Sequence, residues 1–143
     1  MPRGNIKMTY YLCYGSPLMD RSLDRKVDTL RLEGQGRLDG YKLAFSRQGG
    51  QPNLEAAAGS KTWGCLFLVE ERMLPELDKQ EAGGTRHQGQ AYFEGKQTDC
   101  IFYTYASQPG QPSAEFVAAF RSAYDQASLP QAPIDQALGL VAK

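Results

Sequence analysis

The chain has 143 residues, of which 41% are hydrophobic and 22% are charged, and 16 Lys and Arg residues balance 16 Asp and Glu residues. This length suits a single domain with one substantial core, so we expect one domain over residues 1–143. Zero net charge offers no field for nucleic acid or an anionic membrane, and no apolar run approaches the roughly 18 residues of a membrane span. We therefore expect a soluble protein that binds neither nucleic acid nor membrane.

The start of the chain predicts a strand followed by a tight loop. Residues 1–7 are expected to form a loose N-terminal arm. Secretion is not expected, because neither the apolar segment nor the cleavage site of a secretion signal follows the basic residues at the start of the chain. Met8–Cys13, rich in Tyr and Leu, is typical of a buried strand. The strand runs into Tyr14-Gly15-Ser16-Pro17-Leu18, where Gly15 lets backbone N–H groups approach an anion closely. The same pattern also fits an ordinary turn.

The next segment predicts a short charged helix and then a β-hairpin. We expect the helix over Met19–Asp28 and a strand over Thr29–Asp39 that is bent or bulged at its glycines. Asp39-Gly40 is a hairpin turn signal, which makes Tyr41–Phe45 the returning strand.

Strands dominate the centre of the chain. Gln48–Lys61 is a connection containing Gly and Pro that could still pair as a strand, and Thr62–Val69 is the strongest strand pattern. A helix over Glu70–Gln80 follows, with Pro75 near its first turn and Gly83-Gly84 after its end.

The last third predicts a hairpin and two helices. Gln90–Phe93 and Asp99–Tyr105 flank the turn, Ser113 is the expected N-cap of a helix over Ala114–Ala127, and Pro133 opens a final short helix. Strands and helices do not alternate regularly, which favours an α+β fold over a doubly wound parallel sheet.

The three cysteines predict no special chemistry. Cys13, Cys65 and Cys100 are odd in number, widely spaced and set in apolar runs. This is typical of small buried side chains in a reducing compartment, so we expect a cytoplasmic protein with neither a disulfide nor a zinc site. His87, the only histidine, could in principle pair with one of them, but no residue near the cysteines suggests a lowered thiol pKa.

Four segments in fixed order carry a resemblance to a known family. They are Tyr14–Leu18, Gly40–Phe45, Thr62–Phe67 and Leu77-Asp78-Lys79-Gln80-Glu81-Ala82. Together they resemble the γ-glutamylcyclotransferase family, whose members have a Tyr-Gly-Ser-Asn-Leu loop, a Val-Trp-Gly-Val-Leu-Tyr strand and a Leu-Asp-x-x-Glu-Gly segment. The resemblance covers roughly residues 8–130 and implies a small mixed barrel-like β-sheet flanked by helices.

The resemblance also implies a reaction. In this family the α-amine of a γ-glutamyl group attacks its own γ-carbonyl, giving 5-oxoproline and releasing an amine or amino acid. Glu81 would be the catalytic acid/base, and Tyr14, Gly15, Ser16, Pro17 and Leu18 would form the substrate-binding loop. The substrate supplies the nucleophile, so the resemblance implies neither a metal nor a cofactor. From the local pattern alone, Glu81 would be one of several solvated carboxylates on a charged helix.

The chain departs from the family pattern at three points. Pro17 stands where Asn is usual and lacks one N–H donor, and Ala82 stands where Gly is usual. The family's animal members carry a Tyr several residues after the Glu, but here Arg86 and His87 occupy that region. Both residues are expected in a loop, where they could donate a hydrogen bond or contact the leaving group, although a solvent-facing role fits His87 equally.

Two functions remain open. The first is a γ-glutamyl cyclotransferase-like enzyme whose partner is a small γ-glutamyl substrate, acting as a monomer or a homodimer. The alternative is a module on the same fold that binds γ-glutamyl compounds without turning them over. The leaving group is left open by the sequence.

Overall fold

The computed structural model describes residues 7–15, 31–47, 50–108 and 111–139. The strands are β1 (Met8–Cys13), β2 (Arg31–Ala44), β3 (Asn53–Glu70), β4 (Thr85–Phe93) and β5 (Lys96–Thr104). The helices are a 3₁₀ helix (Glu71–Met73), α3 (Leu74–Gln80), α4 (Ala114–Gln126) and α5 (Ala132–Ala137). The helix expected over Met19–Asp28 lies outside the described residues.

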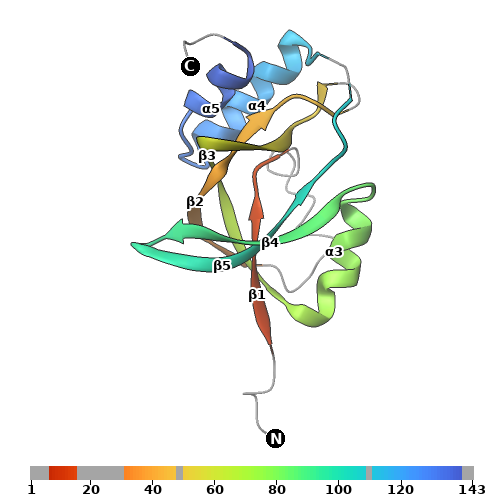
Figure 1. Ribbon diagram of the computed structural model, residues 1–143, viewed down its shortest axis with the longest axis vertical. Helices are drawn as coiled ribbons and strands as arrows, with labels where there is room; N and C mark the ends of the chain where they lie inside the picture. The colour runs from red at the N-terminus through yellow and green to blue at the C-terminus, as the bar shows by residue number, and fades with distance from the viewer. Residues whose placement is uncertain (1–6, 16–30, 48–49, 109–110, 140–143) are drawn as a thin grey trace, which may run out of the picture.

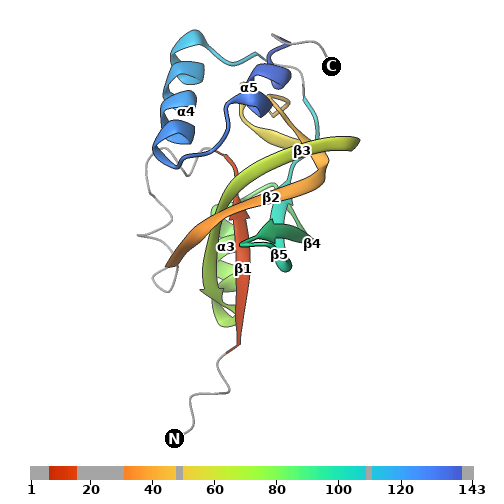
Figure 2. The same cartoon turned by 90° about the vertical axis from the view of Figure 1, so that its left-hand side faces the viewer.

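The five strands form a closed barrel in the order β1-β3-β2-β4-β5. Parallel pairing of β1 with β5 closes the barrel, through Tyr10 opposite Cys100 and Tyr11 opposite Ile101, and the other pairings are antiparallel. In Figures 1 and 2, α4 and α5 lie together at one end of the barrel, whereas α3 lies beside the strands away from that end. The expected α+β class with a mixed barrel-like sheet and flanking helices is confirmed.

The predicted hairpin turn at Asp39-Gly40 is wrong, because β2 runs through it without reversing. The pairing of β2 with β3 shifts register between Asp39 and Tyr41, and Gly40 has a φ of 88°. A β-bulge and a two-residue turn both favour glycine in this backbone region, so the sequence signal is shared by the two structures. β3 is correspondingly long and includes most of the segment expected as a connection before Thr62.

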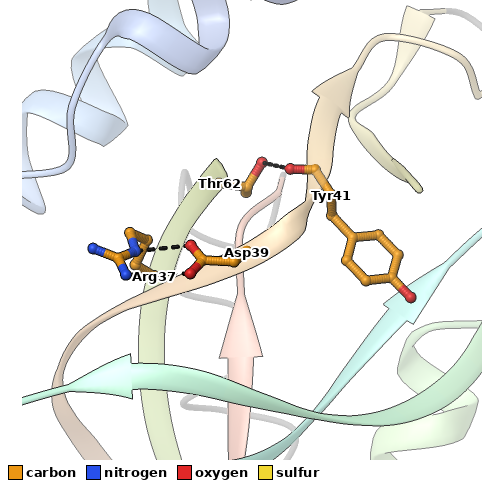
Figure 3. A network of polar contacts seen from close by, with 4 residues as sticks. All are labelled: Arg37, Asp39, Tyr41 and Thr62. Atoms are coloured by element: carbon orange, nitrogen blue, oxygen red, sulfur yellow. Dashed lines mark hydrogen bonds and ion pairs between the residues drawn. The ribbon is translucent and has the colours of Figure 1, made fainter. Parts of the chain in front are cut away.

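Side chains on both strands surround this bulge (Figure 3). Fully buried Thr62 donates its hydroxyl to the Tyr41 carbonyl at 3.2 Å, and Arg37 pairs with Asp39 at 2.8 Å. The register shift interrupts the backbone hydrogen bonds of the sheet at this place. The Thr62 hydroxyl donates to a backbone carbonyl that would otherwise have no partner in the core. The second register shift, between Leu32 and Gly34, falls where the glycines predicted a bulge.

Several other expectations are confirmed. β1 has the predicted bounds, and β4 and β5 form the predicted hairpin, although β4 begins earlier, at Thr85. Ser113 caps α4, its Oγ accepting the Phe116 N–H at 3.0 Å, and Pro133 lies in the first turn of α5.

Aromatic residues of α4 complete the core at the end of the barrel. Phe120 and Tyr124 are fully buried with ring centroids 4.7 Å apart, and Phe45 meets Phe120 edge-on at 5.8 Å. The three cysteines are buried and free. Among the described residues, no helix is long and apolar enough to cross a membrane.

Gly64 sets how closely β3 can approach the end of β1. A Cβ at this position would lie 2.6 Å from the Cys13 carbonyl oxygen, which belongs to the backbone and cannot rotate away. We predict that Gly64→Ala lowers the free energy of unfolding by about 1–3 kcal/mol, measured by urea denaturation. Ser60→Ala in the same strand is the control and should change it by less than about 0.5 kcal/mol. Equal effects of the two substitutions would show that the close approach of the Cys13 carbonyl does not exclude a side chain at position 64.

Candidate functional site

Glu81 ends α3 and turns its carboxylate into the protein. Its N–H donates to the Leu77 carbonyl at 3.0 Å, while its own backbone (φ −94°, ψ 42°) leaves the helical region. Leu77 is completely buried and fixes this last turn against the core. Glu81 is only 9% exposed, and it is the one acidic residue among the described residues that is buried. A buried carboxylate needs hydrogen-bond donors close by, because desolvation otherwise makes its charge costly.

Two tyrosines supply these donors. Tyr11 of β1 donates its hydroxyl to Glu81 Oε2 at 3.1 Å, and Tyr105, just after β5, donates to Oε1. The two phenols therefore take one carboxylate oxygen each. Hydrogen bonds to a charged acceptor are stronger than neutral ones, so this arrangement fixes the orientation of the Glu81 side chain.

Both phenols stay protonated far above neutral pH. Burial raises the pKa of Tyr11 and of Tyr105, and the negative charge of Glu81 raises each pKa further. A neutral phenol is a donor, whereas a phenolate could not donate to a carboxylate. At neutral pH the side chain of Glu81 is therefore held by two permanent hydrogen-bond donors.

The beginning of the predicted binding loop lies beside this carboxylate. Tyr14 donates its hydroxyl to the Tyr103 carbonyl at 2.6 Å, and its own carbonyl accepts the Tyr124 hydroxyl at 2.9 Å. Tyr14 is thus held by β5 and by α4 directly before Gly15. Ser16, Pro17 and Leu18, the rest of the predicted loop, lie outside the described residues.

A small pocket opens at this place. Glu81, Tyr14 and Gly15 share it, so it brings together the predicted catalytic residue and the described part of the predicted binding loop. The remaining lining residues are Tyr11, Cys13, Arg47, Pro52, Tyr103 and Tyr105. The Arg47 guanidinium lies over the Tyr105 ring, with its carbon 3.5 Å from the ring centroid.

Arg86 and His87 lie in β4, so the expectation that they belong to a loop is wrong. Arg86 pairs with Asp78 at 3.2 Å. His87 Nε2 lies 2.7 Å from the Thr104 hydroxyl, and its ring stacks on Phe102 at 5.3 Å. Neither is among the described residues that line the pocket. Thr85–Phe93 forms a strand because it pairs along its whole length with β5.

Asp78 connects α3 to the barrel. It accepts the Tyr103 hydroxyl at 2.6 Å from β5, in addition to the Arg86 contact from β4. Asp78 precedes Glu81 by three residues, so these contacts hold the last turn of α3 against the two strands. Arg86 thereby contributes to the position of Glu81 from outside the pocket.

The cysteine beside the carboxylate has no features of a nucleophile. Burial raises the pKa of the Cys13 thiol, and the charge of Glu81 raises it further, so the thiolate is disfavoured. Among the described residues, no group of three or more His, Cys, Asp or Glu side chains could hold a metal ion. The chemically competent groups here are a carboxylate, phenols and a guanidinium.

Sequence reasoning missed Tyr11, Tyr105 and Arg47. Tyr11 and Tyr105 stand 94 positions apart, and each lies in or next to a strand whose pattern indicates only burial. They meet because β1 pairs with β5. One sequence signal pointed toward them. This chain lacks the tyrosine that the family's animal members have after the glutamate, so any phenol beside Glu81 comes from another part of the sequence.

Comparison with known proteins assigns this barrel and its pocket to a family. The model of the family described as "Gamma-glutamyl cyclotransferase, AIG2-like" matches residues 11–119, which include every described residue that lines the pocket. The chain belongs to this family. A search of curated proteins gave no match.

Solved structures share the fold at low sequence identity. A protein titled "Gamma-glutamyl cyclotransferase" is 18% identical with a TM-score of 0.78, and the match covers 96% of this chain and 90% of the other. An uncharacterised protein from Homo sapiens is also 18% identical, with a TM-score of 0.77 and coverage of 95% and 89%. An AIG2-like protein from Mus musculus is 20% identical, with a TM-score of 0.59 and coverage of 77% and 82%. At these identities the likeness shows the fold alone.

The buried phenols and thiols predict that the protein loses stability in alkali. The pKa values of Tyr11, Tyr14, Tyr105 and Tyr124 are raised above 10.0 by burial, and the pKa of the Cys100 thiol is raised from 9.0 to about 11. Because the unfolded chain ionises first, the contribution of each group is complete below its unfolded pKa and is lost as the pH rises above it. The loss begins near pH 9 for the thiol and near pH 10 for the phenols, and amounts to about 1.4 kcal/mol per pH unit for each group.

Urea denaturation at pH 8.0 and at about pH 10.5 measures this loss. The Tyr124→Phe variant, which has one group fewer, should show a shallower loss over the same interval. A free energy of unfolding that does not change with pH would contradict the placement of these groups in the interior.

Proposed function

We propose that the protein is a γ-glutamyl cyclotransferase-like enzyme that converts a γ-glutamyl group to 5-oxoproline and releases an amine or amino acid. The observation that carries the proposal is the burial of Glu81 in a pocket next to Tyr14 and Gly15, with a phenol on each carboxylate oxygen. Membership of the family supports this reaction class. The pocket offers no thiolate, so a nucleophile supplied by the substrate suits it.

Glu81 would act first as a base. The α-ammonium of the substrate cannot attack a carbonyl, so the carboxylate takes one proton from it. The neutral amine then attacks the γ-carbonyl carbon, forming the new C–N bond of a five-membered ring. The ring closure is intramolecular, so holding the substrate curled provides much of the rate enhancement.

Glu81 would then act as an acid. The tetrahedral intermediate carries a negative oxygen and a leaving nitrogen, and Glu81 returns its proton to that nitrogen. The original C–N bond breaks and the carbonyl re-forms. The ring nitrogen, which still carries two hydrogens after the attack, loses one of them as a proton, and the departing amine takes this proton up. 5-Oxoproline therefore leaves together with an ammonium ion, and Glu81 is again a carboxylate. The backbone N–H groups of the loop that begins at Gly15 are the proposed donors to the negative oxygen.

Tyr11 and Tyr105 would keep the carboxylate oriented while it changes its protonation. Both are donors to the charged form, so they hold Glu81 toward the pocket before the proton is taken. In this chain these two phenols act where the family pattern has a tyrosine shortly after the glutamate.

A binding module is the alternative, and Pro17 favours it. Proline has no N–H, so the loop has one donor fewer for the negative oxygen, and a lost hydrogen bond of this kind costs about 1–3 kcal/mol in the transition state. Under this alternative, γ-glutamyl compounds raise the melting temperature of the protein while no product forms.

The first test is formation of 5-oxoproline, followed by mass spectrometry with a panel of γ-glutamyl amino acids and amines. We predict product with the wild type and a loss of about 10²- to 10⁴-fold for Glu81→Gln, because the amide cannot take the proton. Glu76→Gln, which changes an exposed carboxylate on the same helix, should leave the rate unchanged.

Full activity of Glu81→Gln would contradict the mechanism. A wild type that is stabilised by γ-glutamyl compounds and forms no product would favour the binding module instead. Circular dichroism confirms that each variant retains its fold, which we expect because glutamine has the same shape as glutamate.

The second test concerns the phenol on Oε1. We predict that Tyr105→Phe lowers kcat by about 10-fold, because the carboxylate loses one of its two orienting donors. Tyr92→Phe is the matched control, since Tyr92 is 41% exposed on β4 and should not affect the rate. If both variants had wild-type kcat, the hydrogen bond from Tyr105 would have no part in turnover.

A further inference from the structure

Arg47 lines the pocket and has no role in the proton transfers proposed above. It follows β2, and its backbone is fixed locally: its N–H donates to the Gln51 carbonyl at 3.2 Å, and its carbonyl accepts the Gly50 N–H at 2.8 Å. The nearby Phe45 is buried in the core. A well-anchored backbone thus presents the guanidinium to the pocket that Glu81 also lines.

Arg47 differs from every other arginine that the structure describes. Each of the others forms an ion pair with a carboxylate, with N–O distances of 2.6–3.2 Å. The paired arginines are Arg31, Arg37, Arg72, Arg86 and Arg121. In the described part of the chain Arg47 has no such partner, and its guanidinium contacts the face of an aromatic ring instead. Its five N–H donors are therefore available to an anion that enters the pocket.

Tyr105 separates this positive charge from the negative charge of Glu81. Its hydroxyl donates to Glu81 Oε1, while its ring face carries the Arg47 guanidinium. Both charged groups thus contact the same side chain, Arg47 at the ring face and Glu81 at the hydroxyl. No direct ion pair joins them among the described contacts. The field of Arg47 also opposes the effect of burial on Tyr105 and Tyr14, lowering the pKa of each phenol, so this charge acts on the pocket itself.

This pair of charges matches the zwitterionic end of an amino acid. A γ-glutamyl group carries its α-amine and its α-carboxylate on one carbon atom, so the two groups must contact neighbouring sites of opposite charge. We propose that Arg47 binds the α-carboxylate of the substrate while Glu81 faces its α-amine. The substrate class is then compounds with a free γ-glutamyl α-carboxylate, and the inference rests on the proposed γ-glutamyl specificity.

The assignment also gives a reason for tolerating Pro17 in the loop. The family resemblance assigns the α-carboxylate to N–H groups of this loop, and proline removes one of them. A guanidinium offers two parallel donors to a carboxylate, and its bonds are charge-assisted. Arg47 would therefore bind the α-carboxylate in place of the loop, which leaves the remaining N–H groups of the loop to the negative oxygen.

The test compares two ligands that differ only in the α-carboxylate: γ-glutamylethylamide and γ-aminobutyrylethylamide. Binding is measured by titration calorimetry with the full chain carrying Glu81→Gln, so that neither ligand is consumed. We expect this parent to bind γ-glutamylethylamide more tightly. Adding Arg47→Gln should raise the Kd of γ-glutamylethylamide by about 10- to 100-fold and leave that of γ-aminobutyrylethylamide unchanged.

Two variants complete the design. Arg47→Lys keeps the charge and should recover part of the affinity, which a purely structural role would not predict. Arg37→Gln is the matched control, because Arg37 also lies over a tyrosine ring, 5.0 Å from the centroid of Tyr92, but outside the pocket. It should leave both affinities unchanged.

Three results would overturn the assignment. The first is a parent that does not distinguish the two ligands, and the second is an Arg47→Gln variant that weakens both ligands equally. The third comes from γ-glutamylalanine, measured as an additional ligand with a carboxylate on its leaving group. If Arg47→Gln weakened this ligand but not γ-glutamylethylamide, Arg47 would bind the carboxylate of the leaving group. Because binding is measured without turnover, a protein that forms no 5-oxoproline can still bear out the role of Arg47, so the two proposals fail separately.

Discussion

The burial of one carboxylate is the constraint on which the site depends. Glu81 is removed from water at the end of α3, and within the described part of the chain it is compensated by hydrogen bonds from Tyr11 and Tyr105, not by a direct ion pair. These donors come from the two strands whose pairing closes the barrel. Closure of the barrel and construction of the site are therefore one event: an open sheet would leave Glu81 without at least one of its partners.

Tyr105 has a second part in the electrostatics, because it separates Glu81 from Arg47. A direct ion pair between them would neutralise both charges and leave nothing for a ligand. Because each group contacts Tyr105 and not the other group, both can still bind a ligand in the pocket that they line together. Such a pocket suits a small zwitterion, and it suits a reaction in which the protein moves protons while the substrate provides the nucleophile.

The fold and the site were predictable to different extents. Local signals sufficed for β1, for the hairpin turn after Phe93 and for the Ser113 cap of α4, because each depends on neighbouring residues. Gly40 misled, since a bulge and a turn require the same backbone conformation. The resemblance pointed to Glu81, whereas its partners Tyr11 and Tyr105 are set by strand pairing over long sequence distances, which no local pattern encodes.

A crystal structure of the Glu81→Gln variant with γ-glutamylethylamide would test the central claim most directly. The account predicts the α-amine within hydrogen-bonding distance, about 2.6–3.2 Å, of the side chain at position 81, with the γ-carbonyl directed to the loop that begins at Gly15. A ligand that placed its α-amine away from position 81, or that bound outside the pocket lined by Tyr11 and Tyr105, would contradict it.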